Sequence, residues 1–397
     1  MNFQLQVSRE RLDRVLGVLK HALEKKVTLP ILQHIVMDIS VQEMTLKTTD
    51  MELAFEATLP IEGSGTKLVA VPGKKMVETI RTYPDGILTF EWPEEGNGSK
   101  MLMRAKGFNS EHNIQNAEGF PELPKPEPSK HVVKLPMALF KKATQLGAIA
   151  TSKDPTKAAI SGVLMHLTSK FIRIVSTDGF RLAVVEFQCD TGLTAEGGRG
   201  SKGSKEHSED RPTNVEEKII VPKRAMDIIC SSFDEDTPLE LSWDDRSLFV
   251  HQPNLKFSTR RVTANYPAYE KVLPAELPHH VVVDREEFIK ILRFVGLKKD
   301  DYNKNVRLFF EFPNLRVMVQ HPDEGINQAS LNFSGAEQPL ELAFNIDYLT
   351  ELMDKLPGDE VEYQFKDDVG QGVFMSPSLQ DMSFKYILMP VKFASPN

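Results

Sequence analysis

The residue types that perform catalysis or bind metals are scattered along this chain of 397 residues. Ten histidines are present, but none stands in an HExxH motif or at another metal-ligand spacing. The sequence contains no nucleophile elbow, no EF-hand loop and no glycine run that follows an apolar strand, as dinucleotide binding requires. Carboxylates are numerous, but none pairs in a context that suggests acid–base chemistry. The sequence therefore predicts no catalytic residue, no metal ligand and no cofactor.

Two similar motifs each contain an aspartate that could act as a base. Asp50 stands in KTTDMELA, and Asp178 stands in VSTDGFRLAV. Each aspartate follows a Thr-Thr or Ser-Thr pair, and the Asp178–Gly179 step separates two apolar segments, which is a strong hairpin signal. We expect both aspartates to form turns rather than to catalyse a reaction.

The segment 191–216 contains GGRGSKGSK, which could suggest a phosphate-binding loop. It lacks the G-x-x-x-x-G-K-[ST] spacing, and no apolar strand leads into it. Its glycine, serine and mixed charges cannot bury enough apolar surface to fold. A flexible, solvated insertion is the better interpretation.

Cysteine usage and hydropathy indicate the compartment. Cys189 and Cys230 lie far apart, and neither belongs to a CxxC motif, which is typical of a reducing compartment and argues against structural zinc. The chain starts without a signal-peptide hydrophobic region, and no apolar run approaches the roughly 18 residues of a membrane span. We expect a cytoplasmic protein without a membrane segment.

The elements around these motifs recur three times. A short strand leading into an amphipathic helix and a turn occurs at 68–86, 218–236 and 341–359. A companion pattern of strand, cap and helix occurs at 5–23, 133–150 and 281–298. Both patterns keep their order in every copy, so the chain reads as one domain used three times. Function is then expected in the assembled surface rather than in one catalytic pocket.

The intervening segments are rich in Val, Ile, Phe and Thr and predict strands, for example at 28–39. Proline-rich stretches at 120–129 and 266–280 indicate linkers. The predicted fold is α+β, with two β-α-β-β-β-like halves per domain and helices lining one side of antiparallel sheets. The predicted domains are 1–128, 129–275 (which contains the insertion) and 276–397.

The predicted helices are unusually basic for an acidic chain. The formal net charge is −8, yet every predicted helix except that at 346–356 has more Lys and Arg than Asp and Glu. The other predicted helices span 9–26, 73–82, 136–150, 222–233 and 284–299. Solvated helix faces are the ordinary explanation, whereas a basic stripe in an acidic protein can bind nucleic acid.

Several motifs occur in the order found in the beta sliding clamps of bacterial DNA polymerase III, and the chain resembles this family over 1–393. They are TLPIL at 28–32, TTD at 48–50, TDGxRLAV at 177–184, VLP at 272–274, VRL at 306–308, SGAE at 334–337, FN at 344–345 and Y-x-x-M-P at 386–390. The resemblance implies a head-to-tail homodimer, a closed ring of six similar domains that slides on duplex DNA. The resemblance further implies that the ring tethers the replicative polymerase as a processivity factor and carries no catalysis.

A sliding ring needs exchangeable phosphate contacts without base readout. Basic residues of the helices would supply them in the lumen of the ring. The candidates are Arg14, Lys20, Lys26, Lys74, Lys75, Arg81, Lys141, Lys142, Lys157, Lys223 and Arg224.

The resemblance also implies a pocket between the second and third domains. It would receive a short hydrophobic peptide from the replicative polymerase, the clamp loader, other polymerases and repair proteins. Apolar walls with an adaptable methionine suit a peptide that carries Leu and Phe. The matching positions are Ile160, Thr177, Gly179, Phe180, Arg181, Leu182, Pro267, Val272, Val369, Ile387, Met389, Pro390, Val391 and Lys392.

Ring closure should join the strand edge near 100–113 of one subunit to the region near 288–299 of the other. Phe108, Leu292 and Phe294 are the candidates for the dimer interface, and each could equally belong to the internal core of the subunit. Two alternatives remain open. One is a repeat-built scaffold that binds only proteins, and the other is a triplicated enzyme, such as a small-molecule transferase, against which the missing catalytic motifs argue.

Overall fold

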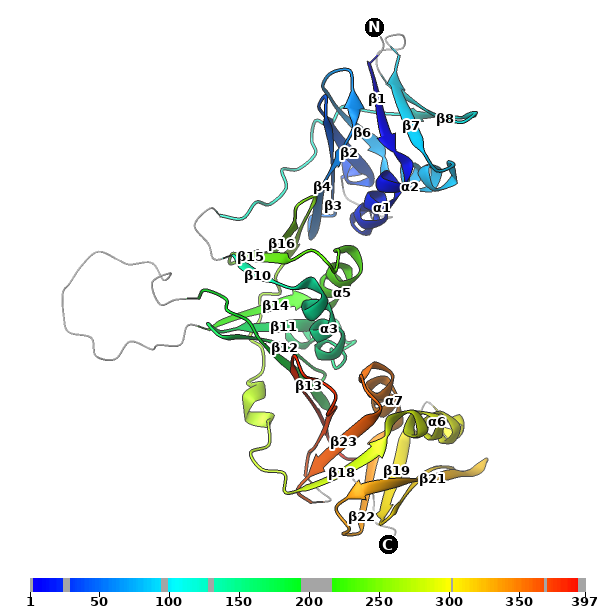
Figure 1. Ribbon diagram of the computed structural model, residues 1–397, viewed down its shortest axis with the longest axis vertical. Helices are drawn as coiled ribbons and strands as arrows, with labels where there is room; N and C mark the ends of the chain where they lie inside the picture. The colour runs from blue at the N-terminus through cyan, green and yellow to red at the C-terminus, as the bar shows by residue number, and fades with distance from the viewer. Residues whose placement is uncertain are drawn as a thin grey trace, which may run out of the picture. The chain divides into compact units, whose positions relative to one another are not determined.

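The computed structural model describes residues 3–23, 29–93, 99–127, 132–193, 216–300, 303–367 and 370–391. The chain divides into two compact units. The N-terminal unit comprises Met1–Met137 and Arg224–Arg261, and the C-terminal unit comprises Ala138–Lys223 and Val262–Asn397. In each unit, antiparallel strands are accompanied by helices (Figure 1), which confirms the predicted α+β class.

The described strands of the N-terminal unit form two antiparallel sheets. The first has the order β5 (Glu62–Gly63), β1 (Phe3–Ser8), β7 (Ile87–Trp92), β8 (Lys100–Ala105) and β9 (Phe108–Asn113). The second has the order β10 (Val133–Leu135), β15 (Leu239–Trp243), β16 (Ser247–Gln252), β17 (Leu255–Arg260), β4 (Leu53–Pro60), β3 (Glu43–Thr49), β2 (His34–Ile39) and β6 (Lys67–Pro72). Strands of the first and second sequence copies meet where β4 pairs with β17.

The described strands of the C-terminal unit form one continuous antiparallel sheet. Its order is β14 (Glu217–Pro222), β11 (Gly162–Leu167), β12 (Phe171–Thr177), β13 (Arg181–Gln188), β25 (Ser383–Leu388), β24 (Gly372–Met375), β23 (Glu360–Phe365), β18 (His279–Asp284), β21 (Gly325–Gly335), β20 (Asn314–His321), β19 (Asn305–Glu311) and β22 (Leu340–Asn345). The second and third copies meet where β13 pairs with β25. Because sheets join successive copies, the compact units cut across the three predicted domains, and those boundaries stay a prediction.

The six predicted helices are confirmed within the described residues. They are α1 (Arg9–Leu19), α2 (Gly73–Thr82), α3 (Met137–Gly147), α5 (Lys223–Ser232), α6 (Arg285–Val295) and α7 (Ile346–Lys355). Ser8 caps α1 by accepting a hydrogen bond from the Arg11 amide, and Asp284 caps α6 by accepting one from the Glu287 amide. The four-residue α4 (Ala158–Ser161) was not predicted, because one turn gives no periodicity.

Two local expectations are wrong. The predicted strand at 28–39 begins only at His34, because Pro30 opens a 3₁₀ turn, Pro30–Gln33; Thr28 lies outside the described residues. The candidate interface residue Leu292 is only 1% exposed. Together with Phe288, Ile291 and Val295 it forms the buried face of α6, so its side chain belongs to the core of the subunit.

Candidate peptide and nucleic-acid interfaces

A pocket of about 320 Å³ lies in the C-terminal unit, and we call it the C-terminal pocket. It collects side chains from α4, from the β12–β13 hairpin, from the segment after β17 and from β25. Ten of the fourteen predicted pocket positions line it. The lining residues are Ile160, Thr177, Gly179, Phe180, Arg181, Leu182, Pro267, Tyr269, Val272, Ile387 and Met389.

Four predicted positions are absent from the lining. Val369 and Lys392 lie outside the described residues. Pro390 and Val391 are described, but the Val391 amide donates a hydrogen bond to the Ala343 carbonyl of β22 at 2.8 Å. The chain therefore turns toward β22 after Met389.

The rim of the pocket is the turn between β12 and β13. The Asp178 carboxylate accepts hydrogen bonds from the amides of Phe180 and Arg181 at 2.9 and 3.1 Å. Gly179 adopts a φ of +96°, which glycine reaches without strain; the Met51 counterpart in copy one has a φ of +76°. The turn leaves Phe180 64% exposed beside Met389, whose amide bonds the Phe180 carbonyl at 3.3 Å. Asp178 thus forms the predicted turn.

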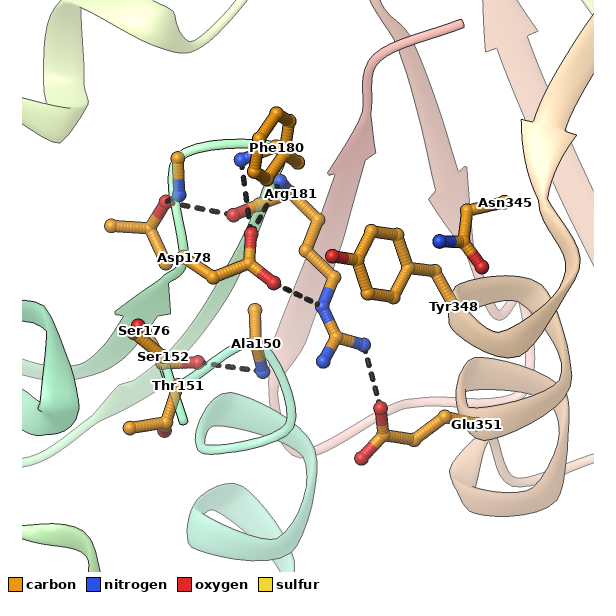
Figure 2. A network of polar contacts seen from close by, with 12 residues as sticks. Ala150, Thr151, Ser152, Ser176, Asp178, Phe180, Arg181, Asn345, Tyr348 and Glu351 are labelled. Atoms are coloured by element: carbon orange, nitrogen blue, oxygen red, sulfur yellow. Dashed lines mark hydrogen bonds and ion pairs between the residues drawn. The ribbon is translucent and has the colours of Figure 1, made fainter. Parts of the chain in front are cut away.

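Arg181 anchors this turn from beneath (Figure 2). Its buried guanidinium pairs with Asp178 at 3.0 Å and with Glu351 of α7 at 2.7 Å. It also donates a hydrogen bond to the Tyr386 hydroxyl at 3.1 Å. The same group lies 4.1 Å from the ring centroid of Tyr348. Burial disfavours the charge, but Tyr386 and Glu351 outweigh burial, and the pKa of Arg181 is raised. The rim hairpin is therefore fixed to elements of the third copy.

Tyr269 is a pocket residue that sequence reasoning missed. Its hydroxyl lies 2.7 Å from Nδ1 of the buried His166, and it accepts a hydrogen bond from Arg173 at 3.3 Å. Burial raises the pKa of Tyr269 to about 12 and lowers that of His166, despite an opposing effect of Glu216. The phenol and the imidazole are both neutral near pH 7. The sequence signal that could have identified Tyr269 as a pocket residue is its position as an aromatic residue just after the Tyr266–Pro267 step.

The candidate DNA-binding residues differ in their exposure and in whether they form ion pairs within the subunit. Within the described chain, Arg14, Lys20 and Lys74 are exposed and make no ion pair. They lie on α1, on the 3₁₀ turn that follows it (Lys20–Ala22), and on α2, which packs against α1. The other candidates in the described chain belong to other segments: Lys157 is exposed, and Lys141, Lys142 and Lys223 are half-buried.

The remaining candidates have partners in the subunit or lie outside the described residues. Lys75 pairs with Glu78 at 3.1 Å, and Arg81 pairs with Asp13 at 3.5 Å. Arg224 donates to the His21 carbonyl at 2.6 Å and lies 3.6 Å from the Asp50 carboxylate, so it joins α5 to the first copy. Lys26 lies outside the described residues.

Among the strand edges that stay open in the described sheets, two have counterparts that are paired in another copy. The strands β9, β17 and β25 hold equivalent places in the three copies, since each follows β8, β16 or β24 in its sheet. Whereas β17 pairs with β4 and β25 pairs with β13, β9 pairs only with β8. The strand β21 follows β19 and β20 as β13 follows β11 and β12, and its residues 325–332 pair only with β20. The open edges of β9 and β21 are thus the counterparts of edges that are paired elsewhere in the chain.

Exposed apolar side chains accompany both open edges. Phe108 at the start of β9 is 51% exposed. Near β21, Ile326, Phe294 and Leu297 are exposed, and Asn327 donates to the Phe294 carbonyl at 3.1 Å. Apolar residues beside unpaired backbone groups are typical of a surface that another chain covers.

The described residues contain no group of three His, Cys, Asp or Glu side chains that could hold a metal ion. None of their helices has the length and apolar character needed to cross a bilayer.

Three family models match the chain. They are the N-terminal domain of the DNA polymerase III beta subunit at 1–124, its central domain at 134–196 and its C-terminal domain at 270–392. Among curated relatives, the beta sliding clamp of Synechocystis sp. is 24% identical over 96% of this chain and 97% of its own length. That of Escherichia coli K12 is 23% identical over 97% and 99%.

Solved structures agree in fold. The beta subunit from DNA polymerase of Streptococcus pyogenes has a TM-score of 0.86 at 19% identity, covering 98% of this chain and all of that one. The DNA polymerase III subunit beta from Pseudomonas aeruginosa has a TM-score of 0.85 at 18% identity, with the same coverage.

We expect Arg181→Met to lower the free energy of unfolding by about 3 kcal/mol, because it leaves Asp178 and Glu351 without their shared cation. Urea unfolding followed by far-UV circular dichroism measures the loss. Lys385→Met, at an exposed lysine of the adjoining β25, makes the same charge change and should have little effect. Equal stability of the two variants would contradict the anchoring role of Arg181.

Proposed function

The chain belongs to the family of bacterial DNA polymerase III beta subunits, the beta sliding clamps, and we propose that it acts as the processivity ring of a replicative DNA polymerase. Two copies close into a ring around duplex DNA, and the ring tethers the polymerase while it slides. The observation that carries the proposal is the pair of complementary open edges at β9 and β21.

Ring closure follows from the repeat. Inside the chain, the last strand of one copy pairs with a strand from the middle of the preceding copy: β17 pairs with β4, and β25 pairs with β13. The same contact between chains would join β9 of one subunit to β21 of the other. This contact joins two different surfaces, so two subunits form a closed ring only if the rotation between them also brings the second pair of edges together. Phe108 and Phe294 lie beside these edges and are the proposed interface residues.

DNA binding would come from basic side chains that are free to exchange phosphates. Arg14, Lys20 and Lys74 are the best placed, because they are exposed and make no ion pair among the described residues. Contacts of this kind are independent of sequence and weaken with salt, which permits sliding. A net charge of −8 would disfavour DNA on other surfaces.

The C-terminal pocket is the proposed docking site for partners. Its apolar wall of Leu182, Val272 and Ile387, with the exposed Phe180 and Met389 at the rim, suits a short peptide carrying Leu and Phe. Met389 is flexible and polarizable, so the rim can adapt to related peptides. The proposed partners are the polymerase catalytic subunit, the clamp loader, other polymerases and repair proteins.

We expect Met389→Ala combined with Pro390→Ala to weaken peptide binding at least tenfold, because the change removes the adaptable rim and loosens the chain beyond it. Fluorescence anisotropy with a labelled peptide containing Leu and Phe measures the affinity. Lys385→Ala serves as the matched surface control on β25. Normal affinity in the double variant would exclude the C-terminal pocket as the docking site, and an unchanged elution volume shows that the assembly is intact.

We expect the triple variant Arg14→Glu, Lys20→Glu and Lys74→Glu to bind duplex DNA more weakly. The slope of log affinity against log salt concentration should fall by about 3, since each phosphate contact contributes roughly 0.9. A salt series of DNA-binding isotherms measures this slope. The control variant reverses Lys170, Lys366 and Lys385, which are exposed on turns and on β25. Equal losses in both variants would contradict a specific role of α1 and α2.

A further inference from the structure

A second cleft, which we call the N-terminal cleft, lies in the N-terminal unit and has a volume of about 430 Å³. Its floor comes from β4, β15, β16 and β17, and its walls include Leu123–Pro126 and Val132. We propose that this cleft is a second peptide-binding site, which takes a short uncharged segment of a partner protein with an aromatic side chain on the floor. This proposal rests on the proposed peptide-binding function of the C-terminal pocket.

Strand register shows that the two sites are counterparts. Aligning TTDMELA (48–54) with STDGFRL (176–182) places Ala54 where the other copy has Leu182, and strand pairing agrees, since Thr49 pairs with Ala54 and Thr177 with Leu182. Ala54 is paired with Ser258, and Leu182 is paired with Ile387. Leu182 and Ile387 line the C-terminal pocket, and Ala54 and Ser258 line the N-terminal cleft.

The covering segments correspond as well. The Phe120–Pro121 step matches the Tyr266–Pro267 step. Counting onward places Leu123 at the position of Tyr269 and Pro126 at the position of Val272. All four of these residues line their respective sites. The same junction of strands and linker therefore creates a recess in both units.

The floor of the N-terminal cleft has room for a large side chain. Ala54, Ser242 and Ser258 are small, and Phe249 offers an aromatic contact. In the C-terminal pocket, Leu182 and Ile387 fill the space that Ala54 and Ser258 leave open. A ligand of the N-terminal cleft should therefore present a bulkier group, for which an aromatic ring is suited.

The charged residues of the cleft already have partners. Lys256 pairs with Glu56 at 2.6 Å, and Glu240 contacts both Lys134 at 2.6 Å and His251 at 3.2 Å. Lys125 pairs with Glu122 at 3.0 Å. A charged ligand would have to compete with these ion pairs, whereas an uncharged segment would not. This arrangement favours a neutral peptide over an acidic or basic one.

The test is the number of peptides bound per chain by the full-length protein. Equilibrium dialysis with radiolabelled acetyl-Gly-Leu-Gly-Leu-Phe-amide should give two per chain. Ser258→Ile restores the bulk of the counterpart Ile387 and should reduce the number to one, as should Met389→Ala with Pro390→Ala at the other site. Ser242→Leu fills the same floor from β15, so it tests the cleft independently if Ser258→Ile fails to fold. Circular dichroism checks the folding of both variants.

The outcomes separate the two proposals. One peptide per chain that is lost with the Met389 and Pro390 changes, but retained in Ser258→Ile and Ser242→Leu, overturns this inference alone. One peptide that is lost only in the floor variants overturns the proposed pocket and supports the inference. No binding overturns both. Equally tight binding of acetyl-phenylalanine-amide at the cleft would show a small-molecule site and overturn the peptide assignment.

Discussion

Antiparallel pairing between strands of successive sequence copies is the interaction on which the rest of this structure depends. The backbone groups of β17 are satisfied by β4, and those of β25 are satisfied by β13. Three copies make only two such junctions, so β9 keeps the open edge that β17 and β25 have paired, and β21 keeps the open edge that β4 and β13 have paired. A sheet edge left in water is a template for further pairing. On this account, two subunits form a ring by pairing these remaining edges, and basic residues of the helices supply the contacts to DNA.

The same junctions also create the C-terminal pocket and the N-terminal cleft. Where β13 meets β25, the segment that leaves the second copy crosses the sheet and leaves the C-terminal pocket beside it. Arg181 lies at this junction and binds residues of β25 and α7, so it links the rim of the pocket to the third copy. Its buried charge is a stability cost that the surrounding Asp178, Glu351 and Tyr386 offset.

Much of the fold could be predicted from the sequence, because its signals are local. Helix caps at Ser8 and Asp284 and the turn at Asp178 depend on residues only a few positions away. The burial of Leu292 was also readable from its spacing to Phe288, Ile291 and Val295. Partners far apart in sequence were not predictable: nothing local indicates that Arg224 binds the His21 carbonyl or that Tyr269 rests on His166. The site was therefore predicted as a set of positions, but its supporting network was not.

The central claim is that two copies satisfy each other's open edges at β9 and β21. Multi-angle light scattering on the eluting protein tests it most directly, because the answer is a mass. The account predicts a single species of twice 44.8 kDa that persists on dilution to the micromolar range. A species of 44.8 kDa at those concentrations would contradict it.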